Sequence, residues 1–425
     1  MTNANSQSGG RQTNGPKTSG RMWTARAALA ERAVCARHVR PLWGLPGTLL
    51  GVSAWPASKV EQLFGPWNYW WQAHVLDCLV DAYVRSPDNR HRSLIERYLN
   101  GIRIRAFHSW LNDYYDDMAW LALAVQRAEQ YVDVHRPVAL PSLTEDIRAG
   151  WTDHSGGGIW WRKREKYHDD FKNVPANGPA AILFARLADE PVSAGQPNGV
   201  VAGSGGAGEP VGRPNRERAR ATVNWIEEQL VDPDTGLVYD GLHVDDDDSI
   251  RGIGKEIYTY CQGTFLGACV ELAIREKADG VRRAGVKIWA DRAVRTINAA
   301  AANLTDPDSE AGPVLRGQGG GDGGLFAAIL ARYLGQAAVQ LPTLGRAYAA
   351  AGQLSADLVY SSAQAAWRNR ADAPHGPLFG PDWTKSAQLP GDGGVAECDL
   401  SVQAAGWMLM ETAAFLERSG VVVSG

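Results

Sequence analysis

The chain of 425 residues has no surplus of basic residues and few cysteines. Lys and Arg number 43 against 47 Asp and Glu, which gives a formal net charge of -4. Without a positive surplus the chain is poorly suited to hold a phosphate backbone, so nucleic acid is not expected as a partner. The cysteines form no CxxC pair of the kind that binds zinc or performs redox exchange. We therefore expect free thiols at Cys35, Cys78, Cys261, Cys269 and Cys398.

Long apolar runs are also missing. The first twenty residues are rich in Gly, Ser, Asn and Thr and lack the apolar core of an export signal, and no run elsewhere has membrane length. We expect a cytoplasmic protein with no membrane span. A misassigned start codon or an unusual export route is the alternative.

Loops that would bind a cation or a nucleotide are not evident. The acidic run 245–248 does not space oxygen ligands across about twelve residues with a turn glycine, as calcium loops do. The glycine-rich segment 317–324 lacks a preceding strand and the Lys-Ser/Thr pair of a nucleotide loop. We expect no metal and no organic cofactor. We interpret 245–248 as a solvated loop and 317–324 as a rim loop, in which Asp322 is a candidate sugar contact.

The sequence is rich in helical periodicity. Apolar residues recur at helical spacing with almost no period-2 alternation, which predicts an all-α fold. The predicted helices span 23–38, 69–85, 89–104, 114–134, 141–151, 173–188, 213–230, 257–278, 280–302, 321–340, 343–369 and 398–418. Twelve helices in successive hairpins would close into an (α/α)6 toroid of six inner and six outer helices.

One domain is predicted over 21–425, preceded by a disordered tail over 1–20. Segment 193–212 consists mostly of Gly, Ala, Pro and Ser with no anchoring aromatic residue, which is typical of a flexible insertion. Other long loops, such as 152–172 and 232–256, are rich in Gly, Asp or aromatic residues. Long loops on a regular scaffold usually carry function.

Two adjacent acids, Asp116 and Asp117, lie in an apolar helical stretch crowded with aromatic residues. The aromatic neighbours are Trp110, Tyr114, Tyr115 and Trp120. Each carboxylate there loses hydration and raises the charging energy of the other, so a chemical task is expected for the pair. The chain has 16 Trp and 13 Tyr but only 8 Phe. Flat side chains with a polar group suit sugar stacking as well as core packing.

The spacing of the two acids permits glycoside chemistry. Neighbouring residues on a helix point about 100° apart, so the two carboxyl groups should lie roughly 5–7 Å from each other. Retaining glycosidases need about 5–5.5 Å and inverting ones about 6.5–9.5 Å, so this spacing allows retention without proving it. The alternative is structural: one acid favoured by the dipole of a helix N-terminus beside a solvated neighbour.

Several blocks of sequence, in order, resemble one known family. They are Asn-Asp-Tyr-Tyr-Asp-Asp-Met-Ala-Trp at 112–120, Tyr-Trp-Trp-Gln-Ala-His at 69–74, Gly-Gly-Gly-Ile-Trp-Trp at 156–161, Asn-Gly-Pro-Ala at 177–180, Val-Tyr-Asp-Gly at 238–241 and Tyr-Thr-Tyr-Cys-Gln-Gly at 258–263. Together they resemble the glycoside hydrolase family 76 endo-α-1,6-mannanases over roughly residues 55 to 415. One departure is Cys261, where the family usually has Asn.

The resemblance implies a retaining hydrolase acting on α-1,6-linked mannan or a mannose-containing glycan or glycolipid. Asp116 matches the family's nucleophile and Asp117 its general acid/base, and no cofactor is required. The expected partner is thus a carbohydrate, and we expect a monomer.

Further residues are candidates to bind the substrate. They are Trp71, Gln72, Trp160, Trp161, Asn177, Asp240, Tyr258, Tyr260 and Gln262. Trp160 and Trp161 are candidates to stack on mannosyl rings, although adjacent tryptophans cannot easily face the same way, so at least one should be core. The polar candidates can bond sugar hydroxyls, but helix capping and helix–helix bonding are equally good readings of each.

Other functions remain open at this point. A sugar epimerase or an unsaturated-uronyl hydrolase could use the same toroid, and fold alone does not separate them. An epimerase would require paired histidines facing the central cavity, and none of the nine His residues forms such a pair in a motif. A catalytically silent glycan-binding toroid requires an Asp pair directed away from any cleft. A transglycosidase differs from a hydrolase only in its products.

Overall fold

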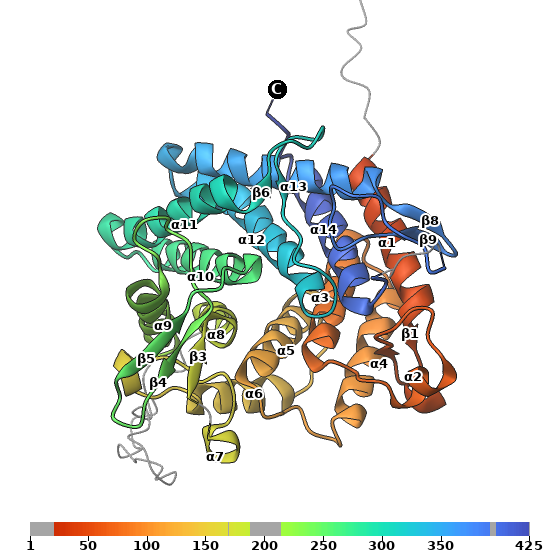
Figure 1. Ribbon diagram of the computed structural model, residues 1–425, viewed down its shortest axis with the longest axis horizontal. Coiled ribbons are helices and arrows are strands. Elements are labelled where there is room, and N and C mark those ends of the chain that lie inside the picture. The colour runs from red at the N-terminus through yellow and green to blue at the C-terminus, as the bar shows by residue number, and fades with distance from the viewer. Residues whose placement is uncertain (1–20, 169, 188–213, 392–396, 425) are drawn as a thin grey trace, which may run out of the picture.

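The computed structural model describes residues 21–168, 170–187, 214–391 and 397–424, and these form a ring of paired helices (Figure 1). The predicted tail over 1–20 and the predicted insertion over 193–212 lie outside the described residues. Fourteen α-helices occur in the described part of the chain. Twelve are long, and each corresponds to one of the twelve predicted helices.

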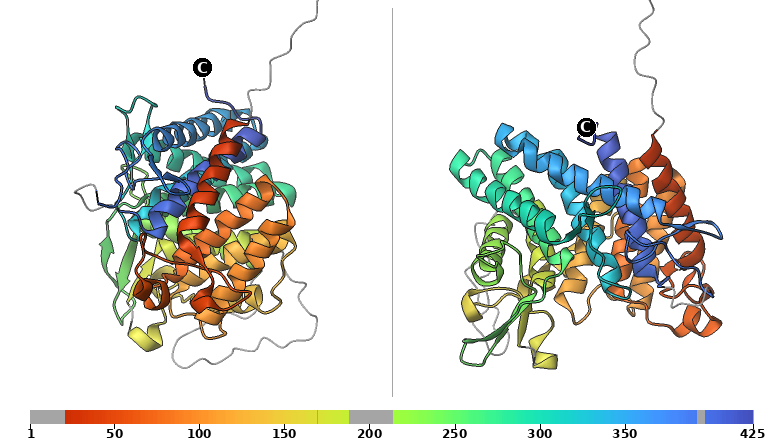
Figure 2. Two further views of the ribbon diagram at one scale, coloured as in Figure 1. Left: turned by 90° about the vertical axis from the view of Figure 1, so that its right-hand side faces the viewer. Right: turned by 45° about the horizontal axis from the view of Figure 1, so that its top comes forward.

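The long helices form two concentric layers (Figure 1). The inner layer consists of α3 (Tyr69–Arg85), α5 (Tyr115–Arg127), α8 (Val174–Arg186), α10 (Thr259–Ala278), α12 (Gly323–Leu344) and α14 (Leu400–Arg418). The outer layer consists of α1 (Met22–His38), α4 (Asn89–Arg105), α6 (Ala139–Ala149), α9 (Asn215–Leu230), α11 (Arg283–Asn303) and α13 (Ala349–Arg368). Each inner helix contacts the next, α14 contacts α3, and each outer helix packs mainly on one inner helix. The fold is the predicted all-α toroid, seen from two further sides in Figure 2.

Glycines allow the inner helices to approach closely. A Cβ atom on Gly178 of α8 would lie 2.4 Å from Oγ1 of Thr264 in α10, and one on Gly263 of α10 would lie 2.8 Å from Cα of Leu330 in α12. Such contacts leave no room for a side chain, and enlarging a packed core residue typically costs about 1–3 kcal/mol. The Asn177-Gly-Pro block therefore marks a tight helix contact inside α8.

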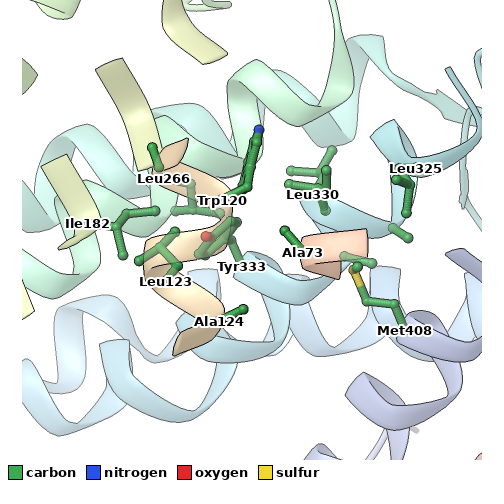
Figure 3. Close-up of a cluster of buried hydrophobic side chains, with 14 of the residues drawn as sticks. Ala73, Trp120, Leu123, Ala124, Ile182, Leu266, Leu325, Leu330, Tyr333 and Met408 are labelled. Atoms are coloured by element: carbon green, nitrogen blue, oxygen red, sulfur yellow. The ribbon is translucent and has the colours of Figure 1, made fainter. Parts of the chain in front are cut away.

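The interior of the ring is filled by apolar side chains, so the toroid has a core instead of an open channel. Trp120, Leu123 and Tyr333 meet there with side chains from the neighbouring inner helices (Figure 3). The helix α12 is the one helix in the described residues that is long and apolar enough to cross a membrane, by length and composition. Of its 18-residue window, 78% is buried inside the toroid.

Short strands occur in the loops, where the sequence predicted none. The strands β3 (Phe171–Asn173), β4 (Gly241–Val244) and β5 (Ile250–Gly254) form an antiparallel sheet that pairs residues far apart in the chain. The two-stranded pairs are β1 (Val39–Arg40) with β2 (Leu50–Gly51), β6 (Thr305–Asp306) with β7 (Val314–Leu315), and β8 (Ala371–Ala373) with β9 (Gly376–Leu378). Strands of two to five residues are too short to show a period in sequence.

Small differences from the predicted helices have local causes. The predicted helix 114–134 ends as α5 at Arg127 and continues as a π-helical turn over Ala128–Val132 before Asp133 adopts a left-handed conformation. Two short helices were not predicted, α2 (Lys59–Phe64) and α7 (Arg164–Tyr167). All five cysteines are free thiols, as expected.

Candidate active site

The N-terminal ends of the inner helices surround a cleft of about 480 Å³. It is lined by Trp70, Asp116, Trp120, Trp161, Phe171, Asn173, Asp240, Tyr258, Tyr260, Gln318, Asp322, Gly323 and Phe326. This volume lies in the range of ordinary ligand sites, and the lining combines aromatic rings with a few polar groups. No Lys or Arg is among these lining residues, although three carboxyl groups are.

Asp116 lies in the first turn of α5, and its carboxyl group accepts two N–H donors. Its Oδ1 accepts from the backbone N–H of Asp117 at 2.8 Å, and its Oδ2 accepts from Nε1 of Trp161 at 3.1 Å. Burial raises the pKa of Asp116 to about 7, the two donors pull it downward, and the charge of Asp240 raises it further. Donors aimed at a carboxyl group favour its ionised form.

Asp117 has fewer donors than Asp116. Its Oδ2 accepts from Nδ2 of Asn112 at 2.5 Å. Burial raises the pKa of Asp117 well above its usual range, and the charges of Asp116 and then Asp322 add to the effect. Two donors therefore favour the ionised form of Asp116, whereas one donor does so at Asp117, and ionisation of either acid opposes ionisation of the other.

Asp322 fixes two tryptophans on the far side of the cleft. It lies just before α12, and its Oδ1 accepts from Nε1 of Trp70 at 3.0 Å and from Nε1 of Trp71 at 2.8 Å. Trp70 lines the cleft, whereas Trp71 is buried and does not. The predicted sugar contact by Trp71 thus does not fit its placement, and its indole instead holds Asp322 in position.

An aromatic wall forms beside the carboxyl groups. Tyr260 of α10 stacks on Phe326 of α12 with ring centroids 3.9 Å apart, and Tyr258 meets the same Phe ring edge-on at 5.4 Å. Both predicted tyrosines therefore line the cleft. Asp240 lines it as well; its Oδ1 accepts from Sγ of Cys261 at 3.7 Å, and burial raises its pKa to about 6.

The adjacent tryptophans of the glycine-rich loop face different ways. Trp161 lines the cleft and donates to Asp116. Trp160 is buried, with the Nζ of Lys172 4.6 Å from its ring centroid, and its Nε1 has no hydrogen-bond partner. The structure therefore places one of the pair at the substrate cleft and the other in the core, and stacking of Trp160 on a sugar does not fit its burial.

Three predicted amides serve the scaffold. Gln72, Asn177 and Gln262 are fully buried near the starts of inner helices. Each amide accepts from the N–H and donates to the C=O of one loop residue, Gly51, Ile159 and Val238 respectively. Gln403 of α14 binds Phe379 in the same way. We name this arrangement the amide clasp. Because both ends of each amide are occupied by backbone, sugar binding by these three residues does not fit the structure.

Other cleft residues were not predicted from sequence. Trp70, Phe171, Asn173, Gln318 and Phe326 line the cleft but were not among the predicted ligands. Asn173 also caps α8 by accepting from the backbone N–H of Ala176. Phe326 looks like any apolar position of α12, so only the three-dimensional contact with Tyr260 distinguishes it. Trp70 could have been found, since it adjoins the predicted Trp71.

The acidic run 245–248 lies in the turn between β4 and β5 and pairs with basic side chains. Asp245 contacts Arg251 at 3.2 Å, and Asp246 contacts Arg164 at 3.1 Å. In the part of the chain that the structure describes, no group of three or more His, Cys, Asp or Glu residues is arranged to hold a metal ion.

The toroid and its acidic, aromatic cleft define the class of protein, a glycoside hydrolase. The chain belongs to glycosyl hydrolase family 76, whose model matches residues 43–190 and 215–419. Among curated proteins, no sequence match was found.

Solved structures agree with this assignment. An α-1,6-mannanase of Salegentibacter sp. HEL1_6 is 28% identical, with a TM-score of 0.70 over 93% of this chain and 99% of that one. The Lin0763 protein of Listeria innocua is 24% identical, with a TM-score of 0.70 over 95% and 99% of the two chains. A family 76 mannosidase of Bacteroides thetaiotaomicron is 18% identical, with a TM-score of 0.71 over 94% and 100%. The last two show a shared fold.

Proposed function

We propose that this protein is a retaining glycoside hydrolase that cleaves α-1,6-linked mannan or a related mannose-containing glycan or glycolipid. The observation that carries the proposal is the unequal environment of two adjacent carboxyl groups beside an aromatic cleft. Asp116 accepts from two N–H donors that favour its ionised form, whereas Asp117 accepts from one donor, and burial together with the charge of Asp116 raises its pKa well above the usual range. This inequality suits an ionised nucleophile beside a protonated general acid.

In the first step, ionised Asp116 attacks the anomeric carbon of a mannosyl unit. The bond from that carbon to the glycosidic oxygen breaks as protonated Asp117 delivers its proton to the leaving oxygen. The products are a mannosyl ester on Asp116 and a shortened glycan. The N–H groups of Asp117 and Trp161, which hold the Asp116 carboxylate, orient it for attack.

In the second step, ionised Asp117 removes a proton from water while the water oxygen attacks the anomeric carbon. The ester bond breaks, Asp116 regains its negative charge and Asp117 regains its proton. Two displacements return the original anomeric configuration.

A relative supports the choice of linkage. An inactive variant of the Salegentibacter mannanase, with two adjacent aspartates replaced by asparagine, has been solved in complex with α-1,6-mannotriose. The aromatic wall of Tyr258, Tyr260 and Phe326 offers flat surfaces for mannosyl rings in this chain.

The test is incubation of the purified protein with linear α-1,6-mannan, branched α-mannan and mannolipids, followed by separation of the products. We expect reducing mannooligosaccharides whose first-formed anomer is α. Products longer than the substrate would identify a transglycosidase, and a β anomer would contradict retention. Binding without turnover would identify a silent glycan-binding toroid.

Matched variants test the two roles. Asp117→Ala should lower turnover of α-1,6-mannan by about 10²–10⁴-fold, and Asp116→Ala should lower it at least as much. The control is Asp113→Ala, because Asp113 lies in the same segment but pairs with Lys166 and Tyr167 outside the cleft. Near-native turnover in either of the first two variants would contradict the assignment.

A further inference from the structure

The inner helices end at a second cavity, on the side of the toroid opposite the cleft. This cavity of about 280 Å³ is lined by five arginines, which we name the arginine pocket: Arg127, Arg186, Arg275, Arg332 and Arg418. Arg127, Arg186, Arg275 and Arg418 come from the last turns of α5, α8, α10 and α14, whose first turns lie at the cleft end. Nothing in the proposed hydrolysis uses this cavity.

Most carboxylates at this end are already engaged. Arg127 and Arg332 both pair with Asp77 and Asp81, which balances two charges with two. Glu271 is shared, lying 2.7 Å from Nε of Arg186 and 3.6 Å from Nε of Arg275. One carboxylate therefore serves two guanidinium groups, and Arg275 has the weaker contact.

Arg418 is the least satisfied member of the pocket. It forms no ion pair with any described residue, and its Nη1 is buried without a hydrogen-bond partner. The nearby Glu411 is engaged by Arg85 at 3.0 Å and by Nε1 of Trp407. Nε of Arg275 forms no hydrogen bond either, although it lies 3.6 Å from Glu271 and the Arg275 side chain is 39% exposed. A buried donor without an acceptor is costly, so Arg418 would gain from an oxyanion in this cavity, and the weakly paired Arg275 could share it.

The helix dipoles offer a simpler explanation of the arginines. Cations are favoured near helix C-termini, where backbone carbonyls lack partners. In the described residues, however, the side-chain hydrogen bonds of the pocket arginines run to Asp77, Asp81, Glu271 and Gln336, and none runs to a helix-end carbonyl. The guanidinium groups are thus not used by helix-end carbonyls, and a guanidinium group can hold an oxyanion such as a phosphate in bidentate geometry.

The remaining lining indicates more than a bare anion. Gln130, Gln336, Gln340 and Thr412 add neutral groups that can bond hydroxyls, and Phe415 and Ile274 add apolar surface. The cavity of about 280 Å³ corresponds to roughly nine waters at about 30 Å³ each. That is space for a monosaccharide-sized molecule.

We propose that the arginine pocket binds a small hydroxylated organic phosphate, with Arg275 and Arg418 as its phosphate ligands. The sugar or polyol part lies against the glutamines and Phe415. This site is independent of the cleft and of the proposed hydrolysis, so either proposal can fail without the other.

The experiment is calorimetric titration of the full chain at fixed ionic strength in chloride buffer. The probes are mannose 6-phosphate, inorganic phosphate and mannose. We expect saturable binding of mannose 6-phosphate with a Kd of about 1 mM or tighter. Weaker binding of inorganic phosphate would show that the hydroxylated part contributes. Equal binding of the two would contradict a role for the hydroxylated part and would leave an anion site only.

Variants locate the binding. Arg418→Gln should weaken mannose 6-phosphate binding by about tenfold or more, and should leave mannose binding unchanged. Arg368→Gln removes the same charge from the last turn of the outer helix α13, where Arg368 pairs with Glu310, and should change nothing. Absence of saturable binding, or equal binding by Arg418→Gln, would overturn the proposal.

The melting temperature of Gln340→Glu tests the charge of the pocket without added ligand and without removing an arginine. It places a carboxylate at the arginine pocket near the end of α12. If the pocket lacks an anion, this variant should raise Tm and weaken phosphate binding. A lower Tm would overturn the proposal, because an acid near a helix C-terminus is unfavourable when no cationic surplus is present.

Discussion

At the cleft end of the toroid, carboxyl groups lie near one another with no lysine or arginine in the lining, whereas each carboxylate that lines the arginine pocket at the opposite end has an arginine partner. The same six helices build both ends. Asp77 and Asp116 make the contrast concrete. Burial raises the pKa of each, but Arg127 and Arg332 outweigh burial at Asp77 and lower its pKa, while Asp116 reaches about 7.

The difference shows how one scaffold keeps some acids permanently ionised and others ready to exchange protons. A partnered carboxylate depends on its arginine, because removing one member of a buried pair leaves an uncompensated charge in the interior. Unpartnered carboxyl groups destabilise the native ring, and they are the groups that can react. Four predictions test this comparison.

Removing an arginine at the far end should have the largest effect on stability. In Arg332→Met, Asp77 and Asp81 lose one of their two partners in a buried network. The free energy of unfolding should fall by about 3–5 kcal/mol in urea titrations. Arg368→Met is the control, since its partly exposed pair with Glu310 should contribute only about 0–1 kcal/mol. Equal losses in both variants would contradict the distinction between the two ends.

Removing an acid at the cleft end should have the opposite effect and raise the free energy of unfolding. The pKa of Asp116 is raised from 3.8 to about 7 in the folded protein, so ionised Asp116 destabilises the fold. Asp116→Asn should therefore raise the free energy of unfolding by about 1–3 kcal/mol at pH 8. Because the folded pKa exceeds the unfolded one, the gain should grow between about pH 4 and pH 7 and be level above. A gain at pH 4 as large as at pH 8 would contradict this origin.

The indole of Trp161 should set the acid limb of the pH–activity profile. Its N–H favours ionised Asp116, so Trp161→Phe should raise the pKa of Asp116 and move the acid limb of kcat/KM upward by about one pH unit. The adjacent Trp160 is a matched control, because its Nε1 has no hydrogen-bond partner. Trp160→Phe should leave that limb in place, and an equal shift in both variants would show that ring size is responsible.

The charge of Asp322 should influence the alkaline limb of the pH dependence of kcat/KM, and this is the smallest of the four expected effects. That charge raises the pKa of Asp117, after the larger contributions of burial and Asp116. Asp322→Asn keeps an oxygen that can accept from Trp70 and Trp71, so the alkaline limb should move down by about half a pH unit. Asp240→Asn removes a charge that acts on Asp116, and should move the acid limb down instead. Shifts of the same limb in both variants would contradict the separate roles.

The sequence predicted the helices well because their apolar periodicity extends over many turns. The long predicted helices agree with the structure to within several residues, for example 69–85 with α3. The strands were missed because each has only two to five residues, too few to show an alternating period. The strand β3 has in addition a partner distant in the chain, since Phe171 pairs with His243, and such pairing leaves no local signal.

At the site, the sequence predicted the acidic and aromatic residues of the cleft better than it predicted the partners of the amide side chains. Asp116, Trp161, Asp240, Tyr258 and Tyr260 do line the cleft, and Asp117 lies beside it. Their roles in catalysis and binding stay predictions. The amides Gln72, Asn177 and Gln262 were misplaced because a side-chain amide bonds a sugar hydroxyl and a peptide group equally well. Only their complete burial reveals which partner they have.

The amide clasp has a consequence for how such a ring can diversify. Gln72, Asn177, Gln262 and Gln403 grip a loop through its peptide groups alone, as one strand grips another. The residues held are themselves constrained, because a Cβ atom on Gly51 would lie 2.9 Å from Oε1 of Gln72, and Ile159, Val238 and Phe379 are buried. The fastening points are therefore fixed, and the loop residues between them are the ones that can change over evolutionary time, so that new sugar specificities can arise without altering the helices beneath.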